Sequence, residues 1–184
     1  MTRRKNCSEE CPRYSESIRN PRMRGFGQKD AKIVLVGDFP GQMEDSRGAS
    51  FVGASGRLLD ATLSRVGMSR SDVYITNAVK CATSMENRKP KDKDIECCSR
   101  YLKKELAVIQ PNVVGALGNT ALKALLNREG IAQIKNNVFF SKEYQVKVIP
   151  IFHPSYVLKN LSATEDFTVG FQLLVKESAS KDIS

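Results

Sequence analysis

The sequence predicts an α/β protein, a three-layer α/β/α sandwich around a central, mainly parallel, four-stranded sheet. Short runs of β-branched residues alternate along the chain with segments of helical periodicity, an order that is typical of parallel βαβ units. Strands of such a sheet are covered on both faces, which fits runs that are apolar throughout. The 184 residues suffice for one substantial core and are too few for two ordinary domains, so we expect a single domain over residues 1–184.

The first half of the chain supplies a βαβ unit. Residues 32–37 read Lys-Ile-Val-Leu-Val-Gly, a buried strand that a loop of glycine and proline ends. Leucine and valine recur at helical spacing within 58–66, and 73–77 reads as the next strand. Residues 1–30 are polar, basic and cysteine-bearing without a sustained period, so we expect an arm that a bound metal would order.

The second half continues the alternation of helices and strands and ends in a polar tail, 178–184, that we expect to fray. The expected elements are a helix within 95–109 that stops before Pro111, a strand at 112–117 with a helix to about 126, two strand-like runs within 136–152, and a helix at 164–177.

Three loops that leave the predicted strands carry suggestive side chains. They begin at Gly37, at Asn77 and at His153, the only histidine of the chain. Ligands of open parallel sheets bind where loops leave the carboxyl ends of the strands. We therefore expect the functional site at this edge of the sheet.

The charge of the chain points to a polyanionic partner. Lys and Arg number 29 against 20 Asp and Glu, a net charge of +9, which attracts nucleic acid. Many basic proteins bind no nucleic acid, so charge alone does not decide. No apolar run approaches the roughly 20 residues that span a bilayer, and no apolar segment follows the basic first residues as in a secretion signal. We expect no membrane association and a cytoplasmic, nucleoid-associated protein.

Five cysteines in an intracellular protein favour metal or redox chemistry over disulfides. The alternative is five unconnected reduced thiols. The polar surroundings of Cys7 and Cys11 argue against that alternative, because buried structural cysteines usually lie in apolar sequence. Four thiolates suit a 4Fe–4S cluster or a tetrahedral zinc ion, and these residues alone do not separate the two.

Three segments resemble the motifs of family-4 uracil-DNA glycosylases, of the uracil-DNA glycosylase superfamily, in the same order. Residues 37–59 read GDFPGQMEDSRGASFVGASGRLL, 75–81 read ITNAVKC with NRKP at 87–90, and 153–159 read HPSYVLK. The resemblance covers nearly the whole chain. It implies a monomeric DNA-repair enzyme that hydrolyses the N-glycosidic bond of uracil, in single- or double-stranded DNA, and leaves an abasic site.

The resemblance also implies a 4Fe–4S cluster, with one pair of cysteine ligands near the N-terminus and a second pair around a loop and a helix start. Such a cluster would pin the arm and the loop at 82–94 to the core. Three residues separate the first pair where the family usually has two, and Cys98 is an alternative to its neighbour. The implied ligands are Cys7, Cys11, Cys81 and Cys97.

By the same resemblance, catalysis falls to Asp38 and His153. A neutral imidazole N–H aimed at uracil O2 would stabilise the charge of the departing base. A carboxylate could orient water or stabilise a cationic sugar. The family usually carries glutamate at Asp38 and a small residue at Phe39. A glycosylase for hypoxanthine or xanthine is therefore an alternative, and a non-catalytic iron–sulfur DNA-binding module is another.

Base recognition requires a nucleotide flipped out of the duplex. Phe51 would stack on the base, a contact worth roughly 1–3 kcal/mol, unless it is a core residue. Asn77 would pair with uracil O4 and N3–H, unless it merely caps its strand. The other predicted substrate contacts are Gly37, Phe39, Gly41, Glu44 and Ser155.

Two segments are expected to touch the DNA itself. A basic loop could bind phosphates, although a solvated charged surface is the alternative. The segment after His153 could insert an apolar wedge into the minor groove. The predicted DNA contacts are Arg88 and Lys89 in the loop, and Tyr156, Val157, Leu158 and Lys159 in the wedge.

Overall fold

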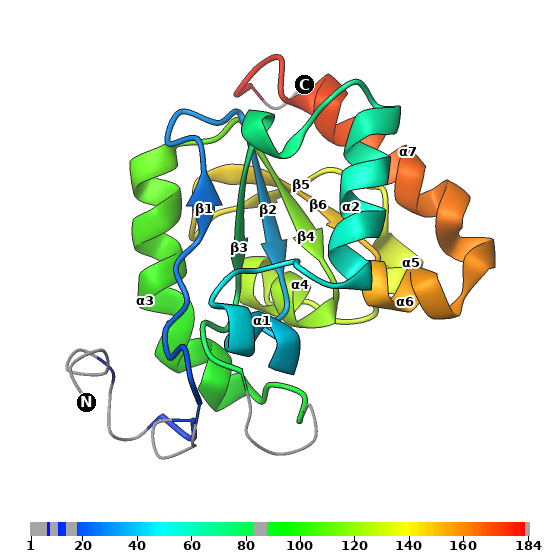
Figure 1. The fold of residues 1–184 in the computed structure, drawn as a ribbon. Coiled ribbons are helices and arrows are strands. Elements are labelled where there is room, and N and C mark those ends of the chain that lie inside the picture. Colours follow the sequence, from blue (N-terminus) through cyan, green and yellow to red (C-terminus); the bar gives the residue numbers. More distant parts are fainter. Residues whose placement is uncertain (1–6, 8–10, 14–17, 83–87, 183–184) are drawn as a thin grey trace.

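The computed structural model describes residues 7, 11–13, 18–82 and 88–182, and these form the expected α/β/α sandwich (Figure 1). The described strands make one sheet of six, in the order β1-β3-β2-β4-β6-β5. Four parallel strands form its centre, as predicted. They are β3 (Val73–Asn77), β2 (Ile33–Gly37), β4 (Val113–Leu117) and β6 (Val146–Ile151).

Two short antiparallel strands raise the total from the four expected to six. β1 (Phe26–Gly27) pairs with β3, and β5 (Phe139–Ser141) pairs with β6. The β1 strand lies in the arm at 1–30, where the sequence predicted no element, because two residues are too few to show a period. The arm residues 1–6, 8–10 and 14–17, and the tail residues 183–184, lie outside the described part of the chain.

The strands alternate their side chains between two helical layers. Ile33 and Leu35 face one layer, and Val34 and Val36 face the other, as the two-residue period of a strand requires. The two layers lie on opposite sides of the sheet in Figure 1. The first layer holds α2 (Ala54–Arg65), α6 (Pro154–Lys159) and α7 (Thr164–Glu177), and the second holds α3 (Asp92–Ile109) and α4 (Asn119–Leu126).

Shorter helices fill the connections. The sequence did not predict α1 (Gln42–Arg47), α5 (Ile131–Ile134) or α6, because a helix of four to six residues is too short for a periodic apolar face. Two short 3₁₀ turns, η2 (Arg70–Asp72) and η3 (Leu161–Ala163), precede β3 and α7. None of the helices in the described ranges combines the length and the apolar character that crossing a membrane requires.

A buried ion pair ties the arm to the core beside β3. The Lys80 Nζ atom lies 2.5 Å from Glu105 Oε2 of α3 and 2.6 Å from Thr76 Oγ1. The backbone N–H of Gly25 donates to Glu105 Oε1. A buried ammonium needs such partners, because its desolvation is costly. The end of β3, the arm and α3 are thereby held together.

We expect Phe167→Ala to lower the free energy of unfolding by about 3–5 kcal/mol, because it removes a buried ring and leaves a cavity. Phe167 is fully buried in α7 and packs against Phe171, with ring centroids 5.0 Å apart. Val169 lies in the same helix and is 42% exposed, so Val169→Ala should change the value by less than about 0.5 kcal/mol. Urea unfolding followed by circular dichroism measures both, and equal losses would contradict this account of the core.

Candidate active site

A pocket of about 640 Å³ opens where the parallel strands end, at the edge that the sequence predicted. Its volume is typical of small-molecule sites, which span roughly 300–1,000 Å³. Loops that follow β2, β3, β4 and β6 all contribute to its wall. The predicted site residues that line it are Asp38, Phe39, Gly41, Glu44, Phe51, Asn77, Lys89, His153, Ser155, Tyr156 and Lys159.

Asp38 follows β2 and lies against the N-terminus of α4. Its Oδ1 accepts a hydrogen bond from the backbone N–H of Ala121 at 2.9 Å. A Cβ atom on Gly118 would lie 2.5 Å from Asp38 Oδ2, so only glycine leaves room for the carboxylate. Burial raises the pKa of Asp38 to about 6, because it outweighs the opposing backbone hydrogen bonds and the charge of Lys89.

Asn77 ends β3 with a side chain that is only 5% exposed. Its Nδ2 donates to the hydroxyl of Ser50, which is also buried, at 3.1 Å. Gly37 lies beside it in the sheet, and a Cβ atom there would come within 2.5 Å of Asn77 Oδ1 and 2.7 Å of Phe51 Cζ. Gly37 is not among the residues that line the pocket, and its lack of a side chain lets Asn77 and Phe51 meet there.

Phe51 is held in a strained backbone conformation. Its φ is +55°, a left-handed value that non-glycine residues seldom adopt. The Arg70 guanidinium donates to the Phe51 carbonyl at 2.6 Å, and a Cβ atom on Gly56 would lie 1.8 Å from that same oxygen. The Phe51 ring stacks beside that of His153, with centroids 5.9 Å apart. The surrounding contacts therefore fix an aromatic ring in the wall of the pocket.

The His153 ring is fixed in one tautomer. The backbone N–H of Ser155 donates to His153 Nδ1 at 3.1 Å, and the Ser155 hydroxyl lies 2.7 Å from the same atom. Because Nδ1 accepts the backbone hydrogen bond, the proton of the neutral ring is on Nε2. Burial lowers the pKa of His153 to about 4. The ring therefore presents an uncharged N–H donor at neutral pH.

The predicted wedge segment forms helix α6, and one of its residues is not accessible. Val157 is 1% exposed and packs in the core, so the structure contradicts a DNA contact at this residue. Tyr156 and Leu158 are 46% and 42% exposed, and Lys159 is exposed as well. The helical period explains the difference, because α6 turns one side toward α2.

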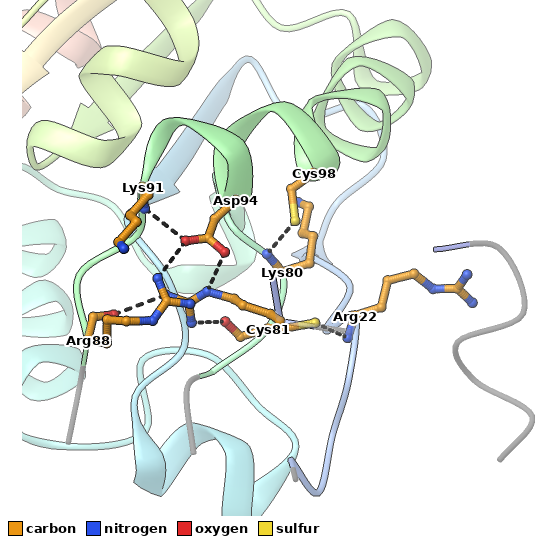
Figure 2. A network of polar contacts seen from close by, with 8 residues as sticks. Arg22, Lys80, Cys81, Arg88, Lys91, Asp94 and Cys98 are labelled. Carbon is orange, nitrogen blue, oxygen red and sulfur yellow. Dashed lines mark hydrogen bonds and ion pairs between the residues drawn. The ribbon is translucent and has the colours of Figure 1, made fainter. Parts of the chain in front are cut away.

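The basic loop divides in a similar way. Lys89 lines the pocket, whereas Arg88 does not, and its Nη1 lies 2.9 Å from Asp94 Oδ2 at the start of α3 (Figure 2). Residues 83–87 of this loop lie outside the described ranges. Arg88 thus forms an ion pair with Asp94, whereas Lys89 lines the cavity.

Sequence reasoning missed part of the wall. Ser50 contacts Asn77, and a further side of the pocket follows β4. The signal for that side was present, because β4 is parallel to its neighbours and its carboxyl end must reach the same edge. The missed lining residues include Gly118, Asn119, Thr120, Ile131, Gln133 and Phe152.

The five cysteines gather around the first half of α3. Cys97 shares a hydrogen bond with Cys11. Burial, and after it the charge and the hydrogen bond of Cys11, raise the pKa of Cys97 to about 11. Cys81 Sγ accepts the backbone N–H of Arg22 at 3.1 Å, and Cys98 Sγ accepts that of Lys80 at 3.3 Å (Figure 2). Cys7 Sγ lies 3.4 Å from the Tyr101 hydroxyl. Thiols from the arm, the end of β3 and α3 therefore meet in one region.

These thiols suit an iron–sulfur cluster in chemistry and neighbourhood, since thiolates are the ligands of such clusters. The arm supplies two of them, the segment after β3 one, and α3 two. In the described ranges, no three Cys, His, Asp or Glu side chains meet in a metal-binding arrangement.

Comparison with known proteins identifies the family. The sequence profile described as the uracil DNA glycosylase superfamily matches residues 24–174. Over 155 residues the chain is 39% identical to a type-4 uracil-DNA glycosylase of Archaeoglobus fulgidus, covering 80% of this chain and 77% of the relative. A type-4 enzyme of Thermotoga maritima is 41% identical over 140 residues, 75% of this chain and 72% of the relative.

A third type-4 uracil-DNA glycosylase, from Pyrobaculum aerophilum, is 34% identical over 170 residues, which cover 89% of this chain and 85% of the relative. These matches confirm the family that the three sequence motifs predicted. The chain belongs to the uracil-DNA glycosylase superfamily and, within it, to the type-4 uracil-DNA glycosylases.

Proposed function

We propose that this chain removes uracil from DNA by hydrolysing the N-glycosidic bond, and that it leaves an abasic site. The observation that carries the proposal is one pocket in which Phe51, Asn77 and a neutral His153 lie together. An aromatic face, an amide and an uncharged donor are what recognition and release of a flipped uracil require. The relatives described above are named for uracil, and neither hypoxanthine nor xanthine gains support from them.

Recognition of the base rests on Asn77. Its amide offers a donor for uracil O4 and an acceptor for N3–H, whereas cytosine presents the opposite pattern at these positions. The hydrogen bond to Ser50 restrains the amide before the base arrives, which lowers the entropy cost of binding. Phe51 supplies the stacking face.

Bond cleavage involves two charges of opposite sign. As the bond from C1′ to N1 breaks, the electron pair stays on uracil, and the Nε2–H of His153 donates to O2. The Asp38 carboxylate orients a water whose oxygen bonds to C1′, and it accepts the proton that this water releases. A neutral donor suits this task, because it stabilises the anionic base without first giving up its proton.

The outer residues of the pocket would hold the DNA. Lys89 and Lys159 line the cavity and would contact phosphates. Tyr156 and Leu158 are the exposed apolar residues of α6 and would fill the space that the flipped nucleotide leaves. All described strands belong to one sheet, and we therefore infer that the chain forms a single domain.

Cys7, Cys11, Cys81 and Cys97 would hold the 4Fe–4S cluster. The hydrogen bond between Cys97 and Cys11 supports the choice of Cys97 over its neighbour Cys98. When bound, the cluster supplies a covalent cross-link among the arm, the end of β3 and α3. The reaction in the pocket needs no electron from it.

His153→Ala should lower kcat for uracil release by about a hundred- to a thousandfold, the usual loss when one preorganised donor is removed. Binding to uracil-containing DNA should be largely kept, because the donor acts chiefly on the departing base. A gel assay of abasic-site formation, with oligonucleotides bearing uracil, hypoxanthine or xanthine, measures turnover and base preference. Failure of the wild-type chain to release uracil would refute the proposed function.

The acid limb of kcat/KM should fall at about pH 6. Asp38 acts as a carboxylate, its pKa is raised to about 6, and kcat/KM reports the free enzyme. Activity is therefore full above this pH and falls as Asp38 takes up its proton below it. His153, with a pKa lowered to about 4, stays neutral over this range. A pH profile of wild type and Asp38→Asn measures the limb, and an unchanged limb in the variant would assign it to another group.

Protein purified without oxygen should hold about four irons per chain, as one cubane cluster requires. Cys81→Ser should lose them, and Cys98→Ser, the matched change at a thiol we do not assign to the cluster, should keep them. Iron analysis and visible absorbance measure both. Loss of iron in Cys98→Ser alone, or a single zinc in the wild type, would show that the ligand assignment is wrong.

A further inference from the structure

Arg13 is an arm residue whose side chain lies in the interior. Its side chain is 1% exposed, and it is among the largest fully buried side chains of the described residues. The guanidinium faces Asp94, whose side chain is 0% exposed, with Nε 3.2 Å from Oδ1. These two atoms form an ion pair and not an aligned hydrogen bond. A charge so far from water has to be compensated, and Asp94 does this.

The rest of the guanidinium holds the two ends of one loop. Nη1 donates to the carbonyl of Cys81 at 2.9 Å, and Nη2 donates to the carbonyl of Arg88 at 3.0 Å. One planar group thus fixes the point where the chain leaves the end of β3 and the point where it returns toward α3. Arginine can do this because its donors form a rigid fork, which the ammonium of lysine lacks.

Asp94 extends the same network along the returning chain. Its Oδ2 accepts from Arg88 Nη1 at 2.9 Å and from the backbone N–H of Lys91 at 2.8 Å (Figure 2). The acid lies in the first turn of α3, where the helix dipole also favours a negative charge. The segment between Arg88 and Lys91 is therefore held on both sides of Lys89.

The network reaches the pocket at two points. The Arg13 guanidinium carbon lies 5.4 Å from the ring centroid of Phe39, and Phe39 lines the cavity next to Asp38. Lys89, which also lines the cavity, directly follows the residue whose carbonyl Arg13 holds. Its charge acts on the Asp38 carboxylate. Arg13 itself does not line the pocket, but it contacts Phe39 and holds the chain next to Lys89.

We propose that Arg13 is a positioning residue for base excision: it places Lys89 and Phe39 beside the reacting sugar and thereby links order in the arm to turnover. This inference rests on the proposed function. Arg13 is two residues from Cys11, whose thiol contacts Cys97 on α3. A ligand that fixes the arm thiols would therefore also fix the Arg13 guanidinium. The cysteine site would then influence the pocket through the carbonyls of Cys81 and Arg88 and through the ring of Phe39.

The test compares Arg13→Lys with Arg24→Lys, the same change at an exposed arginine of the arm. Arg13→Lys keeps a charge for Asp94 and loses the fork. It should retain iron and melting temperature near wild-type values while kcat for uracil release falls about ten- to a hundredfold, the scale on which small misplacements act. Arg24→Lys should match wild type in all of these measurements.

A double-mutant cycle distinguishes positioning from general support of the fold. Combined with Lys89→Gln, the effect of Arg13→Lys on kcat should shrink, because the two residues act on one step. Fold-losses in kcat of Arg13→Lys and Lys89→Gln that simply multiply in the double variant would overturn the proposal. So would an unchanged kcat, or a loss of activity that only matches a loss of iron. If the wild-type chain itself releases no uracil, the proposed function fails, whereas an active wild type with an unaffected variant refutes only the role of Arg13.

Discussion

The parallel register of four strands determines where every part of the site lies. Gly37 pairs with Asn77, and Leu117 pairs with Ile151, so that β2, β3, β4 and β6 end at nearly the same level. Asp38, Asn77 and His153, which are distant in sequence, therefore enter one cavity at or within two residues of their strand ends. A slip of one residue in a strand would exchange its two faces, and would turn Asn77 away from the pocket. The buried, apolar strands make such a slip costly.

Within this frame, close approach is the second constraint. Gly37 and Gly118 leave space for side chains that lie within 2.7 Å of where their Cβ atoms would be. Phe51 keeps an unfavourable backbone conformation because Arg70 and Gly56 enclose its carbonyl. Strain of this kind persists where the surroundings hold it in place, and it is common at functional sites. The pocket is thus built before the substrate arrives.

The sequence predicted what depends on neighbours along the chain. The apolar runs located β2, β3 and β4 to within one residue and placed β6 within 136–152, and the loops after β2, β3 and β6 did form the pocket. It did not predict Arg13 or the contact of Asp38 with Ala121, because these join segments 68 and 83 residues apart and leave no periodic signal. The predicted DNA contact at Val157 was wrong for another reason. The six residues of α6 are too few to show in the sequence which face of the helix is buried.

Proton linkage makes Asp38 a burden on the fold as well as a part of the site. A carboxyl group whose pKa is raised by folding, here to about 6, binds its proton more tightly in the native than in the unfolded chain. It therefore favours the native state in acid, and this preference is lost as pH rises from about 4 through about 6. At neutral pH the ionised group weakens the fold that holds it. The ionised form of Asp38 is therefore the less stable one, and the apolar core must supply the difference.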